Sequence, residues 1–564
     1  MKKLIFLVFV VPMLVFQLGT AAYGWEGRMS GMGDPVGLIS DESDFLILPS
    51  KIANGEGIKY YADGRFLYHN VLDLDWSARL NGPIRISPIL GDLLDLPSSL
   101  RASAAGNWGS SGNLYDYSSM VGAAFPVGAG RMGVFFNYVG QSGDFSGTQG
   151  LSVGPVSTPG FISASSGVGM DSSLDNFNLR VLYGQPLGCD MNIGFEMQVA
   201  YTQEQNDLTN QLRSLMINQT NISGINYNLK NDFFGELFPS MKPFDSNYWE
   251  VLFKAGLEGK FGPASVGMDA RGGPIFGGDN SWTNAQTVGV NNSGLVGTAG
   301  DFFKLNGDVS GFKVGGDLWI RYPYSDKISV PFTVRIDYQE KTRNGSGIGT
   351  AYVDSNAFTG SANFGSQYEN SVKSLDIEAG GGLDVQVSKD LKVAAGLYYN
   401  YINVKDRFAV SLDPGITLPD GLGRLIVNVD DDQFPNSTKN LVKLKLAAEQ
   451  NMQTWSLRGG FTAYGGWVTE DYSSQLGTPV LALTNVLGNS GSLDGGIWGV
   501  MGSVGASFKL NGFTVEPFVQ AGYQSLSISG PGNTSLLGSL ANAPWALSRD
   551  TNEVMVGSGF SILF

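Results

Sequence analysis

The chain has 564 residues, of which 15% are charged and 12% aromatic, and it contains 78 glycines. Soluble proteins carry about 25% charged residues, so this composition favours a sheet with one face in lipid. The formal net charge of −15 argues against a nucleic-acid partner, because phosphates require a basic surface. Cys189 is the only cysteine and His69 the only histidine, so we expect no intramolecular disulfide, metal site, cofactor or enzyme activity.

Residues 1–24 have the pattern of a secretory signal peptide. Two lysines follow the first methionine, an apolar stretch runs from Leu4 to Leu18, and small residues follow at Ala21, Ala22 and Gly24. No other window is apolar for the roughly 18 residues that a membrane-spanning helix needs. We therefore expect an exported chain that is secreted, periplasmic or in a bacterial outer membrane; the strand pattern described below favours the outer membrane.

Residues 25–56 show no sustained alternation, which predicts a compact segment outside the regular sheet. They contain a Ser-Gly-x-Gly motif, an acidic pair and a later Pro-Ser. Here the sequence resembles the long-chain fatty-acid transporter (FadL-type) family of outer-membrane barrels. The matching positions are Ser30, Gly31, Gly33, Asp41, Glu42, Pro49 and Ser50.

This chain departs from the family pattern at Leu48 and Ser50, where that family favours Asn and Ala. The resemblance implies that the segment is a plug or hatch inside the barrel. The alternative interpretation is a periplasmic tail that packs beneath it.

From residue 57 onward, apolar residues alternate with polar ones over long stretches. In one of the clearest, Met191, Phe195 and Met197 lie on one face, and Glu196 and Gln198 on the other. Such stretches reach ten residues or more, as a tilted transmembrane strand requires, whereas soluble strands usually have five or six. Residues 57–564 therefore predict an all-β, transmembrane antiparallel β-barrel.

Short and long connections alternate along this region. Tight links are expected at 128–130, 187–190, 262–263, 324–326, 388–390, 450–452 and 511–512. Between them lie polar stretches at 142–172, 206–246, 277–308, 343–370 and 407–440, which we expect to be long external loops. Seven hairpins plus a first and a closing strand predict about 16 strands, within a range of 14 to 18.

Residues 551–564 predict the closing strand. Val554, Val556, Phe560, Ile562 and Phe564 share one face of an extended backbone. This ending resembles the last strand of outer-membrane barrels, in which the final aromatic residue is part of the insertion signal. The resemblance assigns that role to Phe564 and implies the barrel-assembly machinery as a partner.

The polar face of each strand supplies the predicted lining of the lumen. Its charged members carry both signs, which is compatible with a wet pore crossed by a transverse field or with ion pairs that fill the interior. These candidates are Arg180, Glu196, Glu250, Lys254, Glu258, Asp317, Arg321, Arg335, Asp337, Asp376, Glu378, Asp384, Lys443, Lys445, Glu449, Arg458 and Glu516.

Three functions remain open from the sequence. The first is an outer-membrane channel for passive passage of small molecules, with uptake of hydrophobic compounds as the form that the resemblance implies. The second is a general water-filled porin. The third is a structural barrel around a periplasmic partner protein such as a multihaem cytochrome. Outer-membrane lipid and lipopolysaccharide are expected around the barrel.

In residues 206–218, apolar residues recur at helical spacing. In an external loop they would form a capture groove for a hydrophobic ligand or pack on the rim of the barrel.

Overall fold

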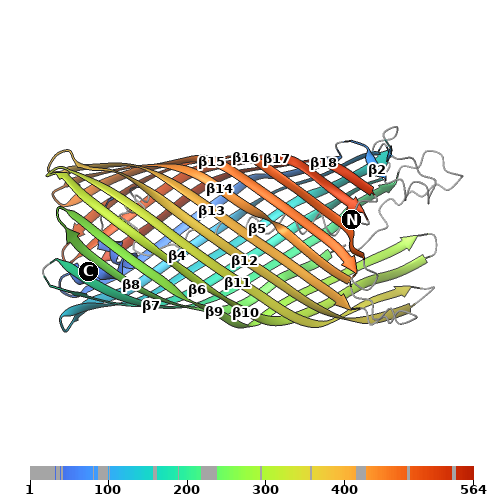
Figure 1. Cartoon of the computed structure of the whole chain (residues 1–564), viewed down its shortest axis with the longest axis horizontal. Coiled ribbons are helices and arrows are strands. Elements are labelled where there is room, and N and C mark those ends of the chain that lie inside the picture. Colours follow the sequence, from blue (N-terminus) through green and yellow to red (C-terminus); the bar gives the residue numbers. More distant parts are fainter. Residues whose placement is uncertain are drawn as a thin grey trace.

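The structure is a computed structural model that is nearly all strand (Figure 1). It describes residues 32, 38–39, 42–80, 82–86, 99–100, 102–155, 162–188, 190–217, 238–292, 295–355, 359–413, 427–478, 483–536 and 541–564. The elements are η1 (Glu42–Leu46), η2 (Pro49–Asn54), β1 (Lys59–Leu80), β2 (Ile84–Ile86), β3 (Ser99–Leu100), β4 (Ala102–Val127), β5 (Gly130–Pro155), β6 (Ile162–Pro186), β7 (Met191–Ile217), β8 (Phe238–Phe261), β9 (Ala264–Asn292), β10 (Leu295–Ser325), β11 (Ile328–Ser355), β12 (Thr359–Gln386), β13 (Leu391–Asp413), β14 (Val427–Met452), β15 (Trp455–Thr478), β16 (Leu483–Leu510), β17 (Phe513–Leu536) and β18 (Ala541–Leu563).

The strands form one closed antiparallel barrel. Each long strand pairs with its neighbours in the chain, and β1 closes the sheet by pairing with β18 on one side and β4 on the other. Closure matters because a barrel without free edges satisfies its backbone hydrogen bonds internally and is stable in lipid. Among the described residues the barrel has 16 strands, with β2 and β3 outside it, which confirms the predicted fold class and strand number.

The seven tight links expected from the sequence lie at one end of the barrel, together with the C-terminus (Figure 1). Gly128, Gly188, Gly262 and Gly512 have positive φ in four of these turns, a conformation that glycine adopts without strain. Two predicted turn positions were wrong. β10 runs to Ser325 and β14 to Met452, so these turns fall at 326–327 and 453–454.

The predicted long external loops were largely wrong, because the strands continue through most of them. β10 has 31 residues, and β9 and β10 pair as far as Asn292 and Leu295. Residues 206–217 belong to β7, so the helical interpretation of that stretch was also wrong. Polar, glycine-rich sequence resembles a loop locally, but a neighbouring strand offers every amide and carbonyl a partner.

The outer surface of the turn half is apolar. Large exposed hydrophobic side chains such as Phe195, Phe253 and Leu446 lie in the half of each strand next to the tight turns. Aromatic pairs border this belt on the far side, among them Tyr201–Trp249, with ring centroids 5.0 Å apart, and Trp498–Tyr523, at 5.2 Å. Such a band with an aromatic girdle is typical of the lipid-facing surface of transmembrane barrels.

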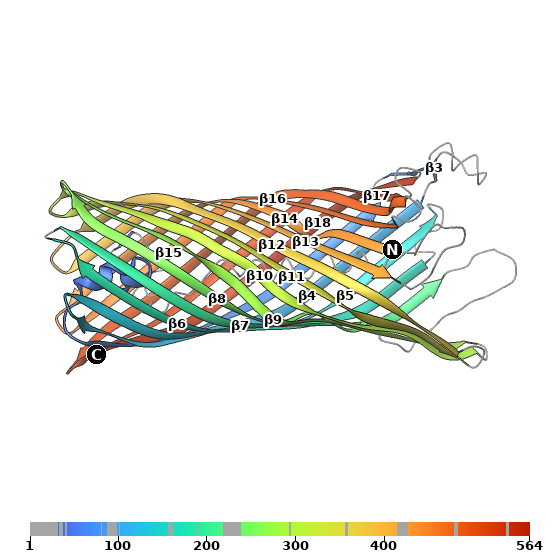
Figure 2. The same ribbon diagram turned by 60° about the horizontal axis from the view of Figure 1, so that its bottom comes forward.

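The strands are much longer than this belt requires. A strand of 26 residues such as β4 rises about 65 Å along the axis at about 3.3 Å per residue and a tilt of about 40°. The apolar band of a membrane barrel is only about 25 Å tall. The barrel therefore has a lipid-facing turn half and an outer half that projects beyond it. Figure 2 shows how far the strands extend from the end that carries the tight turns. None of the described helices is long and apolar enough to cross a membrane.

Candidate transport path

The inner wall carries the charged residues that the sequence analysis selected. Arg180 and Glu196 are 4% and 5% exposed, whereas their neighbours Leu179 and Phe195 are 41% and 50% exposed on the outer face. The two faces of each strand thus differ as the alternation predicts. Within the candidate set, the buried members are Arg180, Glu196, Lys254, Asp317, Asp384, Lys445, Glu449, Arg458 and Glu516. The partly buried members are Glu250, Glu258, Arg321, Arg335, Asp337, Asp376, Glu378 and Lys443. That these residues line a path for solutes stays a prediction.

A belt of ion pairs joins several strands around the inner wall. Asp317 on β10 contacts Arg335 on β11 at 2.9 Å and Arg271 on β9 at 2.6 Å. Arg271 also reaches Asp337 on β11 at 2.6 Å, and Asp269 lies 3.5 Å from Lys254 on β8. The Arg271–Asp337 pair thus joins β9 to β11 across β10, and such ion pairs cross-link the inner wall.

Sequence analysis missed Asp269 and Arg271, although they share the inner parity of β9. The neighbouring residue Met268 is 47% exposed on the outer face. The alternation of Met268, Asp269, Ala270 and Arg271 was therefore the signal that would have identified both.

The belt continues through β12 to β15. Lys443 and Lys445 on β14 lie 2.7 Å and 3.6 Å from Glu378 on β12. Arg458 on β15 contacts Glu449 at 2.8 Å and Glu516 at 2.9 Å. Opposite charges thus neutralise each other along the wall, which is the ion-pair interpretation of these residues.

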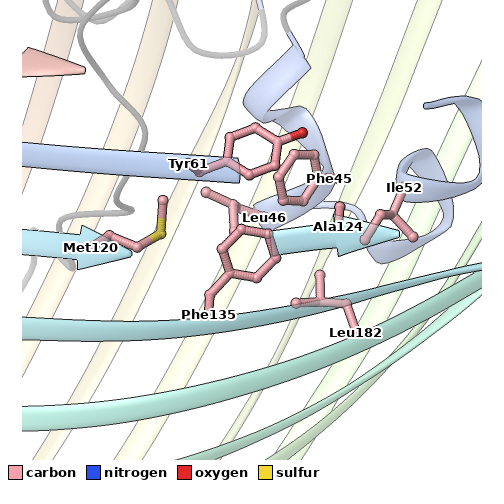
Figure 3. Close-up of a cluster of buried hydrophobic side chains, with 8 residues drawn as sticks. All are labelled: Phe45, Leu46, Ile52, Tyr61, Met120, Ala124, Phe135 and Leu182. Carbon is pink, nitrogen blue, oxygen red and sulfur yellow. The ribbon is translucent and has the colours of Figure 1, made fainter. Parts of the chain in front are cut away.

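The described part of the N-terminal segment (residues 32, 38–39 and 42–56) packs against the inner wall at the turn end (Figure 2). The centroid of the Phe45 ring lies 5.3 Å from that of Phe135 and 5.6 Å from that of Tyr61. Figure 3 shows this cluster, in which side chains of the segment meet those of β1, β4, β5 and β6. Its members are Phe45, Leu46, Ile52, Tyr61, Met120, Ala124, Phe135 and Leu182.

Cations of the barrel also bind the main chain of this segment. Arg180 on β6 donates to the carbonyl of Leu46, and Lys254 on β8 donates to that of Ile47. Arg321 on β10 donates to the carbonyl of Leu38 at 3.0 Å. Charged donors make strong hydrogen bonds to buried carbonyls, so these contacts hold the path of the segment as well as its side chains.

The hatch candidates fall partly outside the described residues. Ser30, Gly31, Gly33 and Asp41 lie there, as do residues 1–24, and Glu42 is described only in its backbone as the first residue of η1. Pro49 and Ser50 are buried in η2. Ser50 lies directly over Gly194 of β7, where an added Cβ would come within 2.2 Å of the Ser50 amide nitrogen.

The outer half of the inner wall has an apolar patch on β14–β18. Val468, Leu493 and Leu526 are nearly fully buried there. The full set is Leu441, Val468, Leu493, Ile497, Leu526, Ile528 and Leu547, with Ala78, Tyr464 and Trp545 packed against it. This patch contrasts with the charged belt closer to the turns.

His69 connects three strands at the seam where the barrel closes. Its Nε2 lies 2.9 Å from a carboxylate oxygen of Asp116 on β4, and its Nδ1 contacts Glu553 on β18. Asp116 accepts a further hydrogen bond from Gln141 on β5 at 2.7 Å. The single histidine therefore bridges two carboxylates, a structural arrangement between the first and last strands.

Among solved structures, the chain is similar to several that are described as channels and transporters. No protein-family model and no curated protein matches. A TodX deltaS2S3 mutant monoaromatic hydrocarbon channel is similar with 10% identity and a TM-score of 0.38 over 96% of this chain and 99% of that one.

The Ralstonia pickettii toluene transporter TbuX is similar with 10% identity and a TM-score of 0.32, covering 96% and 98% of the two chains. A Pseudomonas aeruginosa FadL homologue has 10% identity and a TM-score of 0.32, covering 95% and 97%. These similarities, with TM-scores below 0.5, carry no information about the function of this chain.

Proposed function

We propose that this chain is an outer-membrane channel for the passive uptake of small hydrophobic compounds, closed at its turn end by the N-terminal segment. The observation that carries this proposal is the attachment of that segment to the inner wall. Apolar packing around Phe45 and three barrel cations on the carbonyls of Leu38, Leu46 and Ile47 keep it there. A segment bound in this way obstructs free diffusion of water-soluble molecules.

The apolar patch on β14–β18 supports the class of solute. Tyr464 and Trp545 pack against this patch in the outer half of the inner wall and are partly exposed, so they would give an apolar compound a favourable contact before it meets the charged belt. A polar solute gains nothing from this surface. Because the apolar patch lies outside the charged belt, the arrangement favours entry of hydrophobic compounds from the outer side.

A general porin is the second candidate, favoured by the charged belt from β8 to β15. Rings of charged side chains are how many pores select ions and polar solutes. In this chain most of those charges are paired with each other, as Asp317 is with Arg271 and Arg335. Paired charges present a weaker field to a solute than unpaired ones.

The experiment compares two kinds of solute on the full-length protein. Whole cells that carry the chain in their outer membrane are given radiolabelled toluene, and liposomes that contain the purified protein are tested for swelling in sugars. We expect faster toluene entry than in cells without the chain, and swelling no faster than in protein-free liposomes. Rapid swelling with unchanged toluene entry would identify the chain as a general porin.

A further inference from the structure

A buried polar cluster joins β7 to β11 inside the barrel. The Glu204 carboxylate on β7 accepts hydrogen bonds from Lys341 at 2.9 Å, from Arg343, and from the Tyr248 hydroxyl at 2.6 Å. The side chains of Lys341 and Arg343 are only 3% and 6% exposed. Arg343 also donates to Asn370 on β12 at 3.2 Å, so the cluster is anchored on the far side.

This contact requires a sharp bend in the wall. Three strands, β8, β9 and β10, lie between β7 and β11 in the sheet. Four steps of about 4.8 Å make the path along the sheet about 19 Å. One glutamate side chain, one lysine side chain and a hydrogen bond together span less than that. The two strands can meet only because the wall between them folds inward.

The inner side of this bend, which we call the corner, has its own small apolar core. Tyr248 on β8, Ile275 on β9 and Val309 on β10 pack together and are 2–3% exposed. Strands β8 and β10, and β9 and β11, are not paired with each other, yet each of these two pairs brings Cα atoms within 8 Å.

Glycines on β10 allow a close approach to the backbone of its paired neighbour β11. An added Cβ on Gly307 would lie 1.6 Å from the Asn344 carbonyl oxygen, and one on Gly311 would lie 2.0 Å from that of Glu340. The two glycines of β10 therefore permit the bend, and the Glu204 cluster joins β7 to β11 across it.

The corner lies at the outer edge of the lipid-facing belt. Tyr201 on β7 and Trp249 on β8 belong to the aromatic girdle on the outside, and Tyr248 follows directly on the inner face. Glu204 is opposite Ser246, just beyond the girdle. A solute that comes from the projecting outer half would pass this level as it enters the lipid-facing half.

We propose that Glu204 is a latch that keeps the corner folded and thereby sets the width of the lumen at this level. Its carboxylate is the acceptor that Lys341, Arg343 and Tyr248 share, so its removal breaks the contacts that join β7 to the two cations on β11. The latch rests on the proposed function and deepens it, because a narrowed lumen at the outer boundary excludes large polar solutes. Glu204 is then a specificity-determining residue of the channel.

The test measures the distance across the corner directly. Spin labels are attached at Gln203→Cys on β7 and Asn344→Cys on β11, both exposed outside the lumen, with Cys189→Ser in every variant. Pulsed electron paramagnetic resonance of the protein in lipid nanodiscs gives the distribution of distances. In Glu204→Gln we expect the mean to lengthen by about 5 Å, one interstrand spacing, and the distribution to broaden.

The matched control is Glu340→Gln, which breaks the more exposed Glu340–Lys373 pair between β11 and β12, 3.0 Å long. We expect it to leave the distance unchanged. Folding of each variant is checked by its heat-dependent gel migration. Should Glu204→Gln fail to fold, Lys341→Gln leaves the Glu204–Arg343 pair in place, and we expect a smaller lengthening. An unchanged distance in the folded variants overturns the latch.

The distance and the transport assays separate the two proposals. A longer distance together with absent toluene uptake by the unchanged protein would keep the latch and remove the proposed function. Toluene uptake by the unchanged protein, together with an unchanged distance in Glu204→Gln, would keep the proposed function and remove the latch.

Discussion

Arg180 shows how single buried charges act on the inner wall. Its guanidinium donates to Glu196 on the neighbouring strand and to the Leu46 carbonyl of the N-terminal segment. The Glu196 side chain is 2% exposed, so Arg180 is its buried counter-ion. A buried pair adds little net stability compared with apolar residues, but removal of one member leaves an uncompensated charge. The pair is therefore more sensitive to single substitutions than to its joint replacement.

Arg180→Gln is expected to lower the free energy of unfolding by roughly 3–5 kcal/mol, because Glu196 loses its buried counter-ion. Urea titration of the protein in lipid vesicles measures this change. The double variant Arg180→Gln with Glu196→Gln removes both charges and should recover most of the loss. A single variant that loses less than about 1 kcal/mol would show that water reaches Glu196.

At the scale of elements, the N-terminal segment and the strands fit each other through missing side chains. Gly194 on β7 leaves no space between the strand and the backbone of Pro49 and Ser50. Gly184 on β6 is similar, since an added Cβ would lie 2.7 Å from Ile52. These two glycines let η2 pack directly on the strand backbone, in space that a larger side chain would fill. Glycine in a strand often marks such an approach of another backbone.

Gly194→Ala should therefore displace η2 while the barrel stays closed. We expect sugar-driven swelling of liposomes to rise severalfold above that of the unchanged protein, because the turn end is no longer obstructed. Gly502→Ala on β16 is the matched control, since an added Cβ there has no atom within 4 Å. Equal swelling by both variants would argue against closure by the N-terminal segment.

At the scale of the whole molecule, the outer surface divides into an apolar belt in the turn half and a polar outer half. The wall also bends inward at the corner between β7 and β11. Leu446 lies in the apolar belt with 39% of its surface exposed, whereas Ile348 is 70% exposed on β11 beyond the girdle. The same residue class thus meets lipid in one zone and water in the other. The ion belt and the Glu204 cluster hold the inner side of the same wall.

Substitution of these two residues by arginine should measure the position of the lipid. Leu446→Arg is expected to cost about 2–4 kcal/mol of unfolding free energy, and Ile348→Arg about 0–1 kcal/mol, because the cost of a charge depends on its depth in the bilayer. Reversible unfolding in vesicles gives both values. Equal costs would contradict the assignment of the apolar belt to lipid.

The sequence by itself determined the alternation of faces, the 16 strands and most of the tight turns. These features are local, because the two faces of one strand meet different surroundings and a turn depends on a few residues such as Asn511 and Gly512. The inner parity of Arg180 and Glu196 was therefore readable in one strand.

Only the tertiary structure decided the length of the strands and the partners of the charges. Residues 206–217 extend β7 because β6 pairs with them as far as Ile217 and β8 as far as Asn210, which their own composition does not reveal. Glu204 meets Lys341 because the wall folds between strands 137 residues apart in the chain. Such contacts depend on the closure and curvature of the whole barrel, and no short stretch of sequence encodes either.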